Sequence, residues 1–420
     1  MRTLYLAVLC GGFLVSCSES RPENNGSAAP AAPTETQVSP ATAPGPEPIK
    51  IGQTMPYSGP ASAYSTIGKT QAAYFKKINE EGGVNGRKLE LITLDDAYSP
   101  PKTVEQVRRL VEQDKVLFVY GSVGTPTNSA VHKYLNSKQI PQLFVSTGAT
   151  KWGDPKNYPW TIGFNPTYQL EGQTYAKHIL ENHPKAKIGV LYQNDDYGKD
   201  LLKGLKDGLG DKASSMIVKE VTYEVTDATV DSQITTLKSS KANVFVNITT
   251  PKFAAQAVRR AYDSGWKPIQ YLNQVGASIA AVLKPAGVER GVGALTIAYY
   301  KDPTDEQYDN DPEMQRYKQF MKQYYPEGDL TDGINAYAYM SAQAMVQVLK
   351  QCGPNVTSEN VMKQVANIKE FAPELALPGV VMNTSPTDFF TFDKVQVSRF
   401  DGKSWKSEGK PIEIAGIKAE

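Results

Sequence analysis

The sequence predicts an α/β protein built from two doubly wound parallel-sheet lobes, and three observations support this prediction. Short apolar runs alternate with amphipathic segments, which is typical of strands joined by crossover helices. The alternation occurs in two series, one beginning at residue 49 and the other near Tyr168. With 420 residues, the chain is also longer than one ordinary domain.

The first residues are typical of an export signal. Arg2 provides a positive charge, and residues 4–15 form an apolar run too short to span a bilayer. The run ends in Leu-Val-Ser-Cys, which resembles a bacterial lipobox and predicts a signal peptide over residues 1–16 with a lipid on Cys17. The alternative is an ordinary signal peptide in which Cys17 is incidental. With the lipid, the protein would be anchored to a membrane surface, in the periplasm or on the cell surface.

Residues 17–48 are rich in Pro, Ala, Ser, Thr and Glu and contain almost no large apolar side chain. Such a segment cannot bury enough surface to offset the entropy of ordering, so it is expected to form a tether. Cys10 would leave with the signal and Cys17 would be acylated, which leaves Cys352 in the folded part. We expect Cys352 to be a buried structural thiol.

The first series predicts four strands and three helices. The first helix has its apolar residues largely on one face and stops at Gly82-Gly83, and the second has Ser99 as its N-cap and proline in its first turn. In chain order the segments are strand 49–54, helix 68–81, strand 88–94, helix 100–113, strand 116–120, helix 126–136 and strand 142–145.

The second series repeats the pattern, and frequent alternation of this kind requires a parallel sheet covered on both faces. Its predicted segments are helix 169–182, strand 187–192, helix 197–209, strand 217–223, a helix after Asp227, strand 243–247 and helix 251–264. Helices at 312–325 and 332–351 and a β-rich tail at 389–405 follow. Because the tail differs from the preceding series, the chain is expected to cross between the domains rather than to start a third one.

Charge and motifs exclude several functions. The 45 basic and 44 acidic residues nearly cancel, so no basic surface for nucleic acid is predicted. His132, His178 and His183 lie in or just beyond helices without metal-ligand spacing, and we expect them on solvated helix faces. Phosphate-loop, dinucleotide-binding and nucleophile-elbow motifs are also missing from the sequence. The prediction is therefore a protein that is not an enzyme and uses neither a metal nor a cofactor.

Polar loops follow the predicted strands, where ligands of open parallel sheets collect. Hydroxyl groups and free backbone N–H groups at such positions can hold a carboxylate or an amide. The same residues also serve as ordinary caps and turns. However, hydroxyl residues and tyrosines recur at every strand end, which favours a ligand cleft. The loops are 55–64, 121–128, 146–150, 194–198, 248–251, which includes Thr249, and 273–276, which includes Gln274.

Several of these segments together resemble the branched-chain amino-acid substrate-binding proteins of ABC importers. The likeness extends from residue 49 to the C-terminus and rests on IGQTMPYSGP (51–60), NEEGGVNGRKL (79–89), DDA (95–97), IPQLFVSTG (140–148) and DYG (196–198). The resemblance implies a type I periplasmic-binding fold with three hinge crossovers, near residues 164–165, 294–296 and 383–386. Lobe 1 would comprise residues 49–165 and 296–384, and lobe 2 would comprise residues 166–295 and 385–420.

The resemblance also implies site residues. Thr125, Ser146 and Thr147 match family positions that hold the ligand's carboxylate and ammonium, with Tyr64 from the first loop and Tyr197 from lobe 2. Two differences from the family stand out. Positions 98 and 124 lack the cysteines of a disulfide that some members have, and the loop at 273–276 lacks the acid that pairs with the ligand's ammonium. Either Asp195 or Asp196 would supply that charge, or the ligand has no α-ammonium.

The resulting prediction is a binding protein that captures a small polar molecule and delivers it to ABC permease subunits. An amino acid is the first candidate, followed by an amide, a urea or an aromatic carboxylate. Another possibility is a ligand-sensing subunit of a signalling system with the same fold. The predicted lipid anchor, and the lack of a spanning segment or output domain in the sequence, favour transport.

Overall fold

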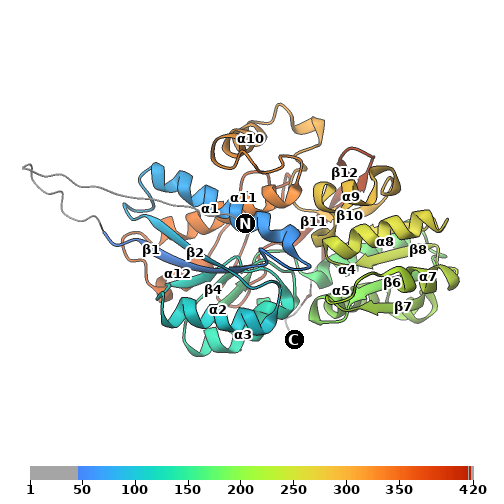
Figure 1. Cartoon of the computed structure of the whole chain (residues 1–420), viewed down its shortest axis with the longest axis horizontal. Helices are drawn as coiled ribbons and strands as arrows, with labels where there is room; N and C mark the ends of the chain where they lie inside the picture. The colour runs from blue at the N-terminus through green and yellow to red at the C-terminus, as the bar shows by residue number, and fades with distance from the viewer. Residues whose placement is uncertain (1–45, 415, 418–420) are drawn as a thin grey trace, which may run out of the picture. The chain divides into compact units, whose positions relative to one another are not determined.

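The computed structural model describes residues 46–414, 416 and 417. The predicted signal peptide, the lipidation of Cys17 and most of the tether lie outside these residues. In the described part the chain forms two sheets with helices, which confirms the predicted α/β class with two lobes. Figure 1 shows β1, β2 and β4 in one half of this part and β6, β7 and β8 in the other.

The first sheet has five parallel strands in the order β2-β1-β3-β4-β5. Its central strands are almost wholly buried, as expected for a parallel sheet covered on both faces. β1 and β2 pair in register from Ile49 opposite Leu89 to Met55 opposite Asp95, so the loops after them begin side by side. The strands are β1 Ile49–Met55, β2 Leu89–Asp95, β3 Phe118–Tyr120, β4 Gln142–Val145 and β5 Thr161–Gly163.

The second sheet has seven strands in the order β12-β11-β10-β9-β8-β6-β7. The strands from β10 to β7 are parallel, whereas β11 runs antiparallel to both β10 and β12. The C-terminal tail therefore completes the sheet of the second series. The strands are β6 Ile188–Gln193, β7 Ile217–Tyr223, β8 Val244–Ile248, β9 Ile269–Leu272, β10 Leu295–Ala298, β11 Lys394–Phe400 and β12 Trp405–Glu413.

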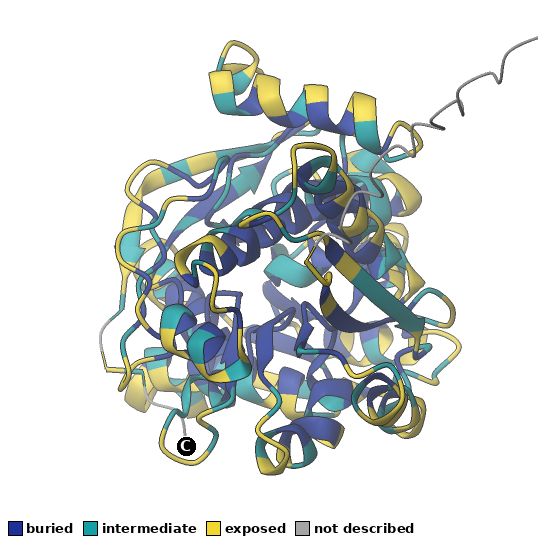
Figure 2. Cartoon of the chain, turned by 90° about the vertical axis from the view of Figure 1, so that its left-hand side faces the viewer, coloured by how far each residue is buried: buried dark blue, intermediate teal, exposed yellow. Residues whose placement is uncertain are grey.

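The helices divide between the sheets. With the five-stranded sheet lie α1 Ser65–Glu80, α2 Pro100–Glu112, α3 Thr125–Ser137, α10 Pro312–Tyr324, α11 Gly333–Gln351 and α12 Ser358–Val365. With the seven-stranded sheet lie α4 Tyr168–Asn182, α5 Asp196–Leu209, α6 Ala213–Met216, α7 Asp231–Ser239, α8 Pro251–Asp263 and α9 Lys284–Ala286. Buried residues gather on the strands and on one face of most helices (Figure 2).

Two details differ from the sequence prediction. β5 was not predicted, because three residues are too few to show a periodic pattern. β10, which belongs to the seven-stranded sheet, extends through the segment where the second crossover was placed, so the chain leaves this sheet after Ala298. As predicted, Cys352 is buried and free.

Glycines let α4 and α5 approach closely. A Cβ at Gly172 would lie 2.4 Å from the carbonyl oxygen of Leu201, and one at Gly204 would lie 2.5 Å from the Cα of Gln169. Larger residues would therefore push the helices apart. This packing sets the positions of the residues at the two N-termini, which contribute to the site below.

Candidate functional site

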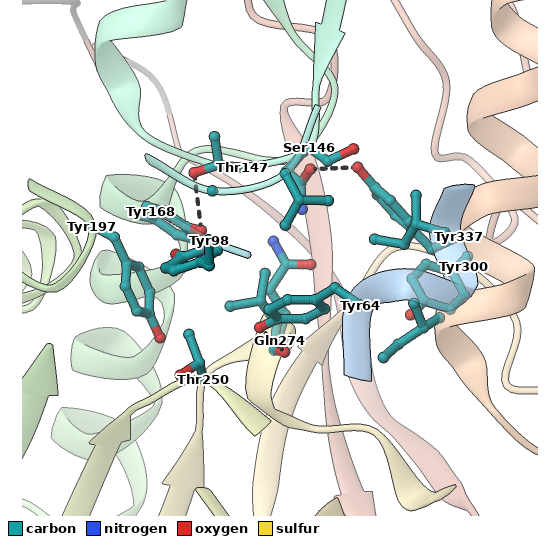
Figure 3. A pocket seen from close by; sticks show the side chains of 16 residues that line it. Tyr64, Tyr98, Ser146, Thr147, Tyr168, Tyr197, Thr250, Gln274, Tyr300 and Tyr337 are labelled. Atoms are coloured by element: carbon teal, nitrogen blue, oxygen red, sulfur yellow. Dashed lines mark hydrogen bonds between the residues drawn. The ribbon is translucent and has the colours of Figure 1, made fainter. Parts of the chain in front are cut away.

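A cavity lies between the carboxyl ends of the two sheets, and loops from both sheets line it (Figure 3). It encloses about 570 Å³ of empty space, part of it open to solvent, which is the size range of small-molecule sites. Sixteen residues line it: Tyr64, Ile67, Tyr98, Val123, Gly124, Ser146, Thr147, Asn165, Tyr168, Tyr197, Thr250, Gln274, Val275, Tyr300, Ile334 and Tyr337.

We call the lining residues that follow β1 to β5, together with those of α11, the first wall. The second wall consists of the lining residues on α4 and α5 and those that follow β8, β9 and β10. The carboxyl ends of parallel strands place these loops at one edge of each sheet, as the sequence indicated.

Five of the seven predicted ligand-binding residues line the cavity. They are Tyr64, Ser146, Thr147, Tyr197 and Gln274. Their binding roles remain predictions, but the fold brings them together from segments up to 210 positions apart in the chain.

The other two predicted residues, Thr125 and Thr249, are buried and do not line the cavity. The hydroxyl of Thr125 lies 2.5 Å from that of Thr147, so it supports a lining residue from behind. The hydroxyl of Thr249 donates to Asn247 Oδ1 at 2.7 Å. Its neighbour Thr250 lines the cavity instead, because adjacent residues after a strand point to opposite sides.

Four lining tyrosines were not singled out as site residues: Tyr98, Tyr168, Tyr300 and Tyr337. The sequence contains 23 tyrosines, and this high content was the only sequence signal for these four. Tyr98 reaches the cavity through a tight turn in which it has a φ of 59° and its backbone N–H donates to Asp96 Oδ1. A left-handed backbone at a tyrosine is uncommon, and Asp96 holds it in place.

Hydroxyl groups of the first wall are already hydrogen-bonded. The hydroxyl of Thr147 is hydrogen-bonded to the hydroxyl of Thr125, and it donates to Tyr168 Oη at 3.2 Å. Ser146 donates to the carbonyl oxygen of Gly121, and Tyr337 donates to Asn165 Oδ1 at 2.9 Å. The bonds from Thr147 to Thr125, from Ser146 to Gly121 and from Tyr337 to Asn165 lie within the first half and fix the wall's shape before any ligand arrives, whereas the bond to Tyr168 reaches the second wall.

The second wall is different, because two of its polar atoms have no hydrogen-bond partner among the described residues. They are the hydroxyl of Tyr197 and Nε2 of Gln274, and both are buried from solvent. Figure 3 shows Tyr197, Thr250 and Gln274 together on this side of the cavity. Burying a polar atom without a hydrogen-bond partner costs free energy, so these two atoms are suited to form hydrogen bonds with a ligand.

Glu171 on α4 supports the second wall from behind. Its Oε1 accepts hydrogen bonds from the backbone N–H of Gln274 and from Tyr175 Oη, each at 2.6 Å. Burial raises the pKa of this carboxyl to about 8, although the two hydrogen bonds act in the opposite direction. Glu171 is therefore mainly protonated at neutral pH. In the sequence it sits three residues after Tyr168 and four before Tyr175, on the same face of the helix.

The two acids considered as charge partners for a ligand do not line the cavity. Asp195 caps α5, accepting from the backbone N–H of Gly198 and from Gln193 Nε2. Asp196 forms an ion pair with Lys151 at 2.7 Å. Each carboxylate is therefore engaged in local structure.

Several contacts join the two halves around the cavity. Tyr64 Oη, in the loop after β1, donates to the carbonyl oxygen of Val275 at 2.8 Å. Thr150, after β4, donates from both its backbone and its hydroxyl to Asp200 Oδ2 on α5, at 2.7 and 2.9 Å. The halves are thus held together on more than one side.

The histidine prediction was wrong for His132. This ring is buried, stacks on Tyr158 with centroids 3.7 Å apart and contacts Trp152. Burial lowers its pKa to about 4, with a further contribution from Lys151, so it is a neutral core residue.

Within the described residues, no cluster of His, Cys, Asp and Glu could hold a metal ion. None of the described helices combines the length and the apolar character that crossing a bilayer requires.

Comparison with known proteins gives a family and a fold. A sequence family described as periplasmic binding protein matches residues 48–394. A Leu/Ile/Val-binding protein homolog 1 from Brucella abortus is 26% identical over 349 residues, covering 80% of this chain and 89% of the relative. An amino acid binding protein from Pseudomonas aeruginosa is 23% identical over 319 residues, covering 73% of this chain and 79% of the relative.

Solved structures agree on the fold. A substrate-binding periplasmic protein from Ralstonia solanacearum superposes with a TM-score of 0.77 at 20% identity, covering 86% of this chain and all of the other. A branched chain amino acid ABC transporter protein from Thermus thermophilus with bound valine gives a TM-score of 0.78 at 15% identity, covering 88% of this chain and 97% of the other.

Proposed function

The chain belongs to the periplasmic binding protein family, and we propose that it is an extracytoplasmic binding protein that captures a small polar ligand and delivers it to an ABC importer. The observation that carries this proposal is the cavity between the two sheets, with polar loops from both of them on its walls. A ligand that contacts both walls would favour the closed arrangement of the lobes.

The ligand candidates are amino acids, amides, ureas and aromatic carboxylates. The names of the relatives from Brucella abortus and Pseudomonas aeruginosa, a Leu/Ile/Val-binding protein homolog and an amino acid binding protein, favour amino acids. The contacts from Tyr64 to Val275 and from Thr150 to Asp200 are the bonds that we expect to form on closure.

The lobe boundaries form part of the proposal. The pairing of β10 in the seven-stranded sheet moves the second crossover beyond Ala298. Lobe 1 would therefore contain residues 49–165 and 299–384, and lobe 2 would contain residues 166–298 and 385–420.

Thermal-shift screening of the purified chain against these four ligand classes tests the proposal. A ligand at 100 times its Kd stabilises the folded state by about 2.7 kcal/mol, which raises the Tm measurably. We expect at least one class to produce such a shift. Deleting the gene should also abolish uptake of the same compound. If no compound shifts the Tm, solute capture is contradicted.

The proposed anchor has its own test. Cys17→Ala should abolish labelling by a fatty acid and release the protein from membranes, whereas Cys352→Ala should change neither. Retention of the Cys17→Ala variant on membranes would contradict the anchor.

A further inference from the structure

Two helix N-termini, one on each wall, face the cavity without a capping side chain. The N-cap residues are Gly124 of α3 and Thr250 of α8, and both line the cavity. The helices have 13 residues each. Proline removes one first-turn N–H group from each helix, at Pro126 in α3 and at Pro251 in α8. The remaining N–H groups of a helix N-terminus carry partial positive charge, so such ends favour an anion over a cation.

Unused side-chain donors point to the same kind of ligand. The hydroxyl of Tyr197 is unpartnered in a side chain only 2% exposed, and Gln274 Nε2 is unpartnered beside it. The proton of Tyr168 is also available, because Tyr168 Oη accepts from Thr147 and no acceptor for its own proton is found among the described residues. Tyr168 and Tyr197 have ring centroids 4.9 Å apart, so both hydroxyl groups belong to one region of the cavity.

Apart from the polar side chains of Ser146, Thr147, Asn165 and Thr250, the rest of the lining is mainly apolar. Ile67, Val123, Val275 and Ile334 line the cavity together with the rings of six tyrosines. This surface is suited to a hydrocarbon or aromatic body rather than to a second polar group.

We infer that the ligand is a small carboxylate with an apolar or aromatic body and no ammonium group. This inference rests on the proposed function of solute capture and specifies its ligand class. The carboxylate would accept hydrogen bonds from Tyr197, Gln274 and Tyr168 near the ends of α3 and α8, and the body would lie against the apolar residues.

A free amino acid fits this cavity less well. Of the sixteen residues that line it in the described structure, none is acidic. The acid that supports the wall, Glu171, lies outside the lining. Its Oε1 accepts two hydrogen bonds and its Oε2 is buried without a partner among the described residues, but the carboxyl is mainly protonated because burial raises its pKa. Burying an ammonium group without an anionic partner costs several kcal/mol.

Matched pairs of compounds that differ only in the ammonium group test the inference. The purified chain is titrated calorimetrically with 4-methylpentanoate and L-leucine, 3-phenylpropanoate and L-phenylalanine, and 3-(4-hydroxyphenyl)propanoate and L-tyrosine. We expect the compound that binds most tightly to be one without an ammonium group. Its affinity should be at least ten times that of the amino acid in the same pair. The inference is overturned if an amino acid binds as tightly as its partner, or if no compound in the panel binds.

Variants connect the result to named atoms. Tyr197→Phe should weaken binding of the preferred acid about tenfold, whereas Tyr262→Phe, at an exposed tyrosine outside the cavity, should leave it unchanged. Glu171→Gln should retain the preference for the acid. If that variant instead removes a preference for an amino acid, Glu171 pairs with an ammonium and the inference is wrong. Solute capture itself would then still stand, since it fails only if the wider thermal-shift panel gives no binder.

Discussion

The two walls of the cavity use their hydrogen-bonding groups differently. On the first wall, Thr147, Ser146 and Tyr337 donate to or accept from other protein groups. On the second wall, Tyr197 Oη and Gln274 Nε2 have no partner within the described part of the chain. The first wall is therefore preorganised by the protein, whereas the second wall would be completed by the ligand.

This difference suggests an order of events. A ligand would dock first on the rigid first wall, and closure would then bring the unsatisfied donors of the second wall onto it. The free energy gained by satisfying buried donors would favour the closed form.

The largest expected effect concerns Glu171, which holds the second wall through Gln274. Its pKa is raised by burial from 4.5 to about 8, so the folded state binds more protons than the unfolded state between these two pH values. The unfolding free energy contributed by this group is therefore greatest below pH 4.5 and is lost as the pH rises towards 8. Glu171→Gln should remove this loss, which amounts to several kcal/mol.

Urea unfolding of both proteins at pH 5 and pH 8 measures this effect. The variant should be the more stable protein at pH 8, and its stability should change less between the two pH values. Parallel pH profiles of the two proteins would show that the carboxyl does not titrate as described.

A substitution on the first wall should destabilise the protein even without ligand. Thr147→Val keeps the side chain's shape but removes the hydroxyl between Thr125 and Tyr168. Two buried hydroxyl groups then lose a partner, which should lower the unfolding free energy by about 1–3 kcal/mol. Thr222→Val, on the exposed face of β7, is the matched control and should change it little. Equal effects of the two variants would argue against a preorganised first wall.

A pair of tyrosine variants compares the walls directly. Tyr337→Phe removes a hydroxyl that donates to Asn165, which should cost about 1 kcal/mol of unfolding free energy. Tyr197→Phe removes an unpartnered hydroxyl and should cost nothing in the unliganded protein. Chemical denaturation without ligand measures both values. A larger loss for Tyr197→Phe would mean that its hydroxyl is already satisfied.

The fold was predictable because the alternation of strand and helix patterns is a local property that persists along both series. β5 escaped prediction because it has three residues. The second crossover was misplaced because β10 adds to the sheet at Leu295–Ala298 not only beside β9, the preceding strand, but also beside β11, which is distant in sequence.

The site was predictable only in part, for a related reason. Sequence position identifies the loops after the strands, but the direction of each side chain depends on where the strand ends. β8 ends at Ile248, so Thr250 rather than Thr249 reaches the cavity. Glu171 was missed because it lies on a helix rather than in a loop, although an acid on a helix face with Tyr168 and Tyr175 is a detectable signal.

The smallest expected effect concerns the ion pair between Lys151 and Asp196, which joins the segment after β4 to the start of α5. The two side chains are 29% and 64% exposed, so solvent screens their attraction. Lys151→Ala should therefore change ligand affinity and the unfolding free energy by about 0.5 kcal/mol or less, and the difference should shrink further at high salt. Calorimetric titration at low and high salt measures the first quantity. A change of more than about 1 kcal/mol would mean that contacts at the edge of the cavity, rather than the unequal walls inside it, control closure.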